Sequence, residues 1–196
     1  MMHFTDITGL SGVIFSIYMF IFRYMDFYRI SSRAKVVLTG VVLIAVSVPL
    51  GGLSIAEFLR GVTGDLSVTT LLLLALPYVS FPIVGRGLAR GEGLTFIAIT
   101  AFAFYPFALG FGMFDPYRLG FGNVWFIALL LLIAVVAWLK QFTLIALSIS
   151  LAVLAWSFGW YESNNLWDYL LDPWVSIYAL VVLIQQGVRK FRTKTI

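Results

Sequence analysis

The segment from Phe121 to Trp160 constrains the fold most strongly, because Lys140 is its only charged residue. A single helix over this segment would be about 60 Å long at a rise of 1.5 Å per residue. That length is roughly twice the hydrocarbon thickness of a bilayer. The chain must therefore turn within the segment, and Lys140-Gln141 is the polar pair at which it can do so. The pattern predicts two apolar helices, over 123–139 and 142–158.

The composition of the chain indicates a membrane protein. Hydrophobic residues make up 61% of the 196 residues and charged residues 11%, against roughly 25% charged residues in soluble domains. Further apolar stretches approach the roughly 20 residues that a membrane-spanning helix needs, at 7–22, 36–56, 66–84, 94–113 and 173–187. We therefore predict an all-α, polytopic membrane helical bundle of about seven transmembrane helices. Residues 1–196 are expected to form one membrane-embedded domain.

Positive charge is unequally divided between the two sets of loops that seven alternating spans create. All but two of the 13 Lys and Arg residues lie in one set, formed by 23–35, 85–92, 140–141 and 188–196. The two exceptions are Arg60 and Arg118. Loops rich in Lys and Arg stay in the cytoplasm, so the N-terminus is predicted outside and the C-terminus in the cytoplasm. This orientation is expected of a multipass protein integral to the bacterial plasma (inner) membrane.

Acidic residues show the opposite distribution. Only Asp26 and Glu92, of the 9 Asp and Glu residues, fall on the predicted cytoplasmic side. A negative outer surface attracts cationic partners and repels anionic ones. The alternative explanation is that loops need polar residues and the inner loops are already basic.

The most distinctive polar segment is the predicted outer loop 160–174, which mixes aromatic rings with carboxylates and amides. Asn164 or Asn165 is expected to cap a short interfacial helix, on which Asp168 and Asp172 would share a face. Asp172-Pro173 also has the pattern of an N-cap followed by the first residue of the last span. The loop is either a binding platform for a headgroup, a sugar or a partner peptide, or an amphipathic helix anchored at the interface.

A second outer cluster contains Glu57, Arg60 and Asp65. Glu57 and Arg60 are three residues apart and can pair on one helix. Asp115 and Arg118 form a similar local group in the next outer loop, and local ion pairing is the alternative to a binding role. The residues that we expect at a ligand or partner site are Glu57, Arg60, Asp65, Asp115, Arg118, Glu162, Trp167, Asp168 and Asp172.

Helix-breaking residues gather in the second, third and fourth predicted spans. Pro49 precedes Gly51-Gly52, the third span contains Pro77 and Pro82, and the fourth contains Pro106. Interior prolines free backbone carbonyls that must find partners in protein or in a wet cavity. The pattern predicts a cavity among these spans that opens outward, although ordinary kinking also explains it. The residues expected to line that cavity are Pro49, Tyr78, Thr100 and Tyr105.

Several chemistries are disfavoured by composition. The chain has no cysteine and a single histidine, His3, so we expect no metal site, no cofactor and no catalytic residue. Membrane lipids and another membrane protein, bound through loop 160–174, are the expected partners, and nucleic acid is not. The leading hypothesis is a non-catalytic partner or scaffold subunit of an envelope membrane complex. A small-solute or ion transporter or channel is the alternative, and an enzyme acting on a lipid-linked substrate is the third.

Overall fold

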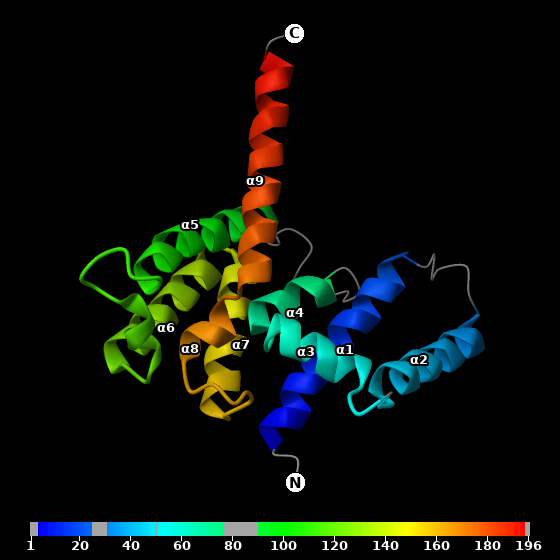
Figure 1. Cartoon of the computed structure of the whole chain (residues 1–196). Coiled ribbons are helices and arrows are strands. Elements are labelled where there is room, and N and C mark those ends of the chain that lie inside the picture. Colours follow the sequence, from blue (N-terminus) through cyan, green and yellow to red (C-terminus); the bar gives the residue numbers. More distant parts are fainter. Residues whose placement is uncertain (1–3, 25–30, 50, 77–89, 195–196) are drawn as a thin grey trace.

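The computed structural model describes residues 4–24, 31–49, 51–76 and 90–194. All regular structure within these ranges is helical, and none of it is strand, which confirms the all-α prediction. The helices, labelled in Figure 1, are α1 (Phe4–Tyr24), α2 (Ser32–Ser47), α3 (Ile55–Thr63), α4 (Val68–Ala75), α5 (Arg90–Ala108), α6 (Val124–Leu139), α7 (Thr143–Ser157), α8 (Leu166–Leu170) and α9 (Pro173–Lys194), with a 3-10 helix η4 (Pro116–Gly120) between α5 and α6.

The turn between α6 and α7 lies where the sequence predicts it. Gln141 has a φ of 64°, in the left-handed region, and its backbone N–H donates to the Trp138 carbonyl at 3.0 Å. The Phe142 N–H donates to the Ala137 carbonyl at 2.8 Å. These bonds satisfy carbonyls that the end of α6 would otherwise leave unpaired. The two apolar helices predicted over 123–139 and 142–158 are therefore confirmed as separate helices.

Pro49 lies at a break in the second predicted span, as the sequence predicts. The last helical residue of α2 is Ser47, Val48 is its C-cap, and the chain then turns through Gly51 and Gly52 at positive φ. A new helix, α3, starts after Ser54. The predicted span 36–56 thus contains two elements, because proline cannot continue a helix beyond its first turn and Ser54 supplies a fresh N-cap.

Pro106 likewise lies close to a helix end. It is within α5, which continues only to Ala108, and Gly110 at a φ of 96° follows. The fourth predicted span, 94–113, is correspondingly shorter at its C-terminal end and begins earlier, at Arg90. Of the third predicted span only residues 66–76 are described, so Pro77, Tyr78 and Pro82, to which predictions were attached, lie outside the described residues.

The helices form two groups joined by α4. Helices α1, α2 and α3 pack on one another, while α4 contacts α1 on one side and α7, α8 and α9 on the other. In the second group α5 packs along α9, and α6 packs along α7 (Figure 1). Gly93 allows α5 to approach α7 closely, since a Cβ there would lie 2.4 Å from Leu144 Cδ2. The C-terminal part of α9 projects beyond the other helices.

Two described helices are long and apolar enough to cross a membrane, Phe4–Ile21 within α1 and Gly91–Ala108 within α5. Helices α6 and α7 are shorter but also apolar. Helix α6 has no charged residue, yet it buries only one stripe of side chains, made by Phe126, Leu130, Ala134 and Ala137. A helix that is hydrophobic all round is normally covered on every side by protein or lipid. The uncovered face of α6 is therefore compatible with membrane association.

Candidate functional site

Segments far apart in the chain meet at one end of the molecule, in what we call the polar layer: residues 4–9, 54–67, 115–123 and 158–173. The Tyr161 hydroxyl donates to the Leu66 carbonyl at 2.6 Å, and Asn165 Nδ2 donates to the Tyr117 carbonyl at 2.9 Å. The Thr8 hydroxyl donates to the Trp160 carbonyl. These bonds join α1, the start of α4, η4 and the loop after α7 into one structure.

Arg60 is the cationic centre of this layer. Its Nε donates to Asp65 Oδ1 at 2.7 Å, and its Nη2 donates to Asp65 Oδ2 at 3.2 Å. Its Nη1 reaches Asp6 Oδ1 at 3.4 Å. Hydrogen bonding to Asp65 raises the pKa of Arg60, opposed by partial burial. Gly9 makes room for the pair, because a Cβ there would lie 2.3 Å from Asp65 Oδ1.

Glu57 is a helix cap and does not pair with Arg60 as expected. Its Oε2 accepts from the Ser54 N–H at 2.6 Å, while the Glu57 N–H donates to Ser54 Oγ at 3.2 Å. This reciprocal capping box satisfies two donors at the start of α3, and the bond from the Ser54 backbone lowers the pKa of Glu57. Asp115 has a similar task in η4, where its Oδ1 accepts from the Tyr117 N–H at 2.9 Å.

Asp172 is a buried carboxylate that fastens α9 to α4. Its Oδ1 accepts from the Val175 N–H at 2.8 Å, as the N-cap pattern of Asp172-Pro173 predicts. Its Oδ2 accepts from the Ser67 N–H at 2.8 Å and from the Thr70 hydroxyl at 2.5 Å. The expectation that it shares a helix face with Asp168 is wrong. Helix α8 stops at Leu170, and the extended Leu171 directs the chain into α9 instead.

Trp167 is a packing residue as well as a candidate contact residue. Its ring lies between those of Phe104 and Phe126, with centroids 4.2 and 4.8 Å away. Its Nε1–H donates to the Pro116 carbonyl at 2.9 Å. Asn165 caps the helix that carries it, by accepting from the Trp167 N–H at 2.9 Å, which confirms the predicted short helix.

An acidic cavity of about 460 Å³ opens in the polar layer. Asp168 lies in its wall and accepts from the Tyr117 hydroxyl at 3.0 Å and from the Ser163 hydroxyl at 2.5 Å. Desolvation, followed by the charge of Asp168, raises the pKa of Tyr117 to about 12, so this hydroxyl remains a protonated donor. The other lining groups include the carboxylates of Asp65 and Asp172 and the rings of Phe104, Tyr105 and Tyr161.

This cavity is negatively charged and partly aromatic. Asp65 is compensated by Arg60, whereas Asp168 and Asp172 receive their hydrogen bonds from neutral groups. Within the described ranges, no group of three or more His, Asp or Glu residues is arranged to hold a metal ion. The arrangement is suited to an organic cation, which carboxylates attract and aromatic faces also stabilise.

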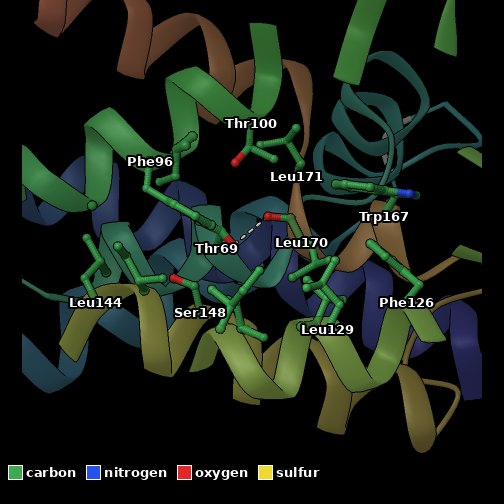
Figure 2. Close-up of a pocket in the computed structure, with 16 residues that line it drawn as sticks. Thr69, Phe96, Thr100, Phe126, Leu129, Leu144, Ser148, Trp167, Leu170 and Leu171 are labelled. Carbon is green, nitrogen blue, oxygen red and sulfur yellow. Dashed lines mark hydrogen bonds between the residues drawn. The ribbon is translucent and has the colours of Figure 1, made fainter. Parts of the chain in front are cut away.

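A second, apolar cavity of about 240 Å³ lies deeper, between α5, α6 and α7 (Figure 2). It is lined mainly by Phe, Leu and Ile side chains, with Thr100 on α5 and Ser148 on α7 as polar members. Ser148 Oγ is buried and has no hydrogen-bond partner among the described residues. Leu171 lines both cavities, so the two lie next to each other along the chain from α8 to α9.

The cavity expected among the second, third and fourth spans stays a prediction, because Tyr78 and the rest of the third span beyond Leu76 lie outside the described residues. Thr100 lines the apolar cavity and Tyr105 the acidic one. Pro49 is exposed and lines neither, and α2 contributes no residue to either cavity.

Some candidate residues stand apart from both cavities. Arg118 and Glu162 are exposed, and neither they nor Glu57 and Asp115 line the acidic cavity. Sequence reasoning missed Tyr117, Tyr161 and Ser163, which complete that cavity. Their only signal is their position in predicted outer loops, which many other polar and aromatic residues share.

No match identifies this chain. No protein family, no curated protein and no solved structure is significantly similar to it. Function must therefore be argued from the site itself.

Proposed function

We propose that the protein is a multipass protein of the bacterial inner membrane, with about seven spans, an external N-terminus and a cytoplasmic C-terminus. With seven alternating spans, the distribution of Lys and Arg assigns the N-terminal segment, 57–65, 115–123 and 159–172 to the same side. These segments meet in the polar layer through bonds such as those from Tyr161 to Leu66 and from Asn165 to Tyr117. Such bonds cannot bridge a hydrocarbon core of roughly 30 Å, so their presence supports the proposed sidedness.

Reporter fusions test this topology. A reporter placed before Phe4 should report the outside, and one placed after Thr193 should report the cytoplasm. A third fusion at Gln141, in the turn between α6 and α7, should agree with the C-terminal one, because Lys140 is a cytoplasmic charge in this topology. Matching readings at the two ends would mean an even number of spans and would contradict the proposal.

We further propose that the protein is a non-catalytic partner subunit of an envelope membrane complex. Most carboxylates of the polar layer already have structural tasks, since Glu57 and Asp115 cap helices and Asp65 pairs with Arg60. Asp172 is buried among three donors. A general acid or base must instead reach the proton that it transfers. The layer is thus better suited to binding than to proton transfer.

The acidic cavity is the observation that carries this proposal. Its carboxylates and aromatic rings are held in place by the surrounding hydrogen bonds, so it needs little rearrangement to bind. We propose that it receives a Lys or Arg side chain from a partner membrane protein, which docks beside loop 160–174. Membrane lipids surround the helices. The negative charge of the acidic cavity repels the phosphates of a nucleic acid, so nucleic acid is not a proposed partner.

Copurification from native membranes tests the partner proposal. The tagged protein, extracted in mild detergent, should retain a stoichiometric partner, and Asp168→Asn should weaken that association roughly tenfold, a change of about 1.4 kcal/mol. Raising the salt concentration should also weaken the association, because salt screens the attraction between opposite charges. Glu92→Gln is the matched control, because it removes the same charge from an exposed residue on the predicted cytoplasmic side, away from loop 160–174.

Two outcomes would contradict the partner proposal. The wild-type protein could run as a lone monomer that retains nothing, or Asp168→Asn and Glu92→Gln could weaken the association equally. Transport and catalysis on a lipid-linked substrate have less support. No charged residue lines the apolar cavity. A coupled ion pathway usually requires such residues.

A further inference from the structure

We propose that the loop after α5, residues 109–114, inserts its side chains into the outer leaflet of the membrane, at the boundary between headgroups and acyl chains. This inference rests on the proposed membrane embedding and does not depend on the partner of the acidic cavity. Three features carry it: exposed apolar side chains, a backbone that makes its hydrogen bonds within the chain, and a position between a candidate span and the polar layer.

The side chains of the loop are apolar and uncovered. Apart from two glycines, the loop consists of Leu109, Phe111, Met113 and Phe114. Phe114 is 60% exposed, and the other three are more exposed still. Figure 1 shows this segment swinging out beyond the end of α5 before the chain returns toward α6, at the left edge of the view. Large apolar side chains exposed together mark a surface that binds lipid or protein.

Hydrogen bonds close the end of α5 without help from solvent. Gly110, at a φ of 96°, donates its N–H to the Phe107 carbonyl at 3.0 Å, and the Phe111 N–H donates to the Pro106 carbonyl at 2.9 Å. This pair of bonds is a Schellman motif, which satisfies carbonyls that a helix end otherwise leaves free. The turn that starts the loop therefore also completes the helix.

The neighbouring amides are satisfied as well. The Leu109 N–H donates to the Tyr105 carbonyl at 2.9 Å, and the Gly112 N–H donates to the Gly110 carbonyl at 3.0 Å. All four successive N–H groups of residues 109–112 thus have a partner in the chain. Water would supply such partners to a loop on a soluble surface, whereas lipid supplies none. This part of the loop can therefore leave water without losing a hydrogen bond from its amides.

The position of the loop matches the outer boundary of the hydrocarbon core. It follows Gly91–Ala108, the part of α5 that is long and apolar enough to cross a membrane. It precedes Asp115, which caps η4 in the polar layer. From residue 93 onward, the exposed residues of α5 are all apolar. The loop thus continues a lipid-facing surface up to the polar layer.

Lipid is a better occupant of this surface than a partner protein. A protein interface usually carries about one hydrogen bond per 100–200 Å² of buried area. The loop has no charged side chain and no side-chain N–H or O–H, and the N–H groups of 109–112 are already bonded. Acyl chains require no such groups. Apolar faces at the membrane surface are typically buried about 5–10 Å into the boundary between headgroups and acyl chains.

Site-directed spin labelling of the purified full-length protein, in vesicles of phosphatidylethanolamine and phosphatidylglycerol, tests this inference. The chain has no cysteine, so Phe111→Cys and Met113→Cys each create one labelling site, at residues that are exposed. Collisions of the label with oxygen, which concentrates in the bilayer, and with a nickel chelate, which stays in water, give its depth. Oxygen should reach both labels more readily than nickel, at a depth of about 5–10 Å below the headgroups.

Two further labels are the controls. Glu162→Cys places a label on an exposed residue of loop 160–174, which nickel should reach more readily than oxygen. Leu132→Cys places a label on the uncovered face of α6, where Leu132 is 60% exposed. Oxygen should reach that label readily and nickel hardly at all. It should also lie deeper than the loop labels, because Leu132 is about 12 Å along α6 from Val124.

Three results would overturn the inference. Nickel could reach the Phe111 and Met113 labels as readily as the Glu162 label, which would place the loop in water. Both labels could be immobilised and shielded from both reagents, which would mean that protein covers the loop. Nickel could also reach the Leu132 label freely, and the membrane embedding would then fail together with this inference. Lipid contact at Leu132 combined with water contact at Phe111 would contradict only the insertion of the loop.

Discussion

Asp172→Ala is expected to lower the free energy of unfolding by about 3–5 kcal/mol. The substitution removes the acceptor of three hydrogen bonds, which Ser67, Thr70 and Val175 donate. These bonds are buried, because only 5% of Asp172 is exposed. Buried donors that lose a charged acceptor lose more than neutral pairs do. The loss is a large part of the roughly 5–15 kcal/mol that stabilises a typical domain.

Unfolding of the detergent-solubilised protein, followed by circular dichroism against denaturant or temperature, measures this effect. Asp172→Asn should destabilise the protein less than Asp172→Ala does. The amide keeps one acceptor oxygen, although its NH₂ group then faces existing donors. Glu162→Ala controls for the loss of an acidic side chain from the same layer and should change stability by no more than about 0.5 kcal/mol. If the unfolding midpoints of Asp172→Ala and Glu162→Ala are equal, the Asp172 carboxylate does not fasten α9 to α4.

Trp167→Ala is expected to destabilise the protein by about 3–5 kcal/mol, as truncation of a large core aromatic does. The ring is held between Phe104 and Phe126 and bonds to the Pro116 carbonyl, so its removal opens the wall of the apolar cavity. Trp167→Phe keeps a ring but loses the Nε1–H bond, and should cost about 1 kcal/mol beyond any repacking. Unfolding midpoints and the yield of folded protein are the readouts.

Trp125→Ala is the control for Trp167→Ala, because Trp125 is 84% exposed and its loss should leave the described core intact. The comparison also separates packing from binding. Asp168→Asn should weaken partner association in a stable protein, whereas Trp167→Ala should reduce the amount of folded protein. Normal folding of Trp167→Ala would contradict this prediction, because it would show that the ring contributes little to the stability of the core. Trp167 would then remain a candidate only for contact with a partner.

Much of the secondary structure follows from local rules. The turn at Lys140-Gln141, the cap at Asn165 and the start of α9 at Asp172-Pro173 are all predicted, because each depends on residues only a few positions apart. The same rules place a helix end at Pro49 when they are combined with the N-cap at Ser54. The break predicted in the second span is observed there, as a turn between the two helices α2 and α3.

Partner choice within the polar layer is not local. Arg60 has Glu57 three positions away, yet it binds Asp65 and also Asp6, which is 54 positions away. Glu57 is already engaged with Ser54, and α1 reaches Arg60 only because Gly9 leaves space for the ion pair. No periodicity or spacing carries that information. The acidic cavity was therefore predictable only as a group of outer carboxylates, without Tyr117 or Ser163.

The amino-acid pattern alone is sufficient for the helical class, for the bounds of α6 and α7 to within a residue or two and for the separation of basic from acidic loops. These properties come from the apolar period, the capping residues and the charges of individual segments, all of which can be counted along the chain. Only the tertiary structure decides that Asp172 is buried, that Trp167 packs between two other rings, and that Asp168 faces a cavity. Those outcomes depend on which helices touch, and helix contacts are selected by the fit of whole surfaces, which no single segment encodes.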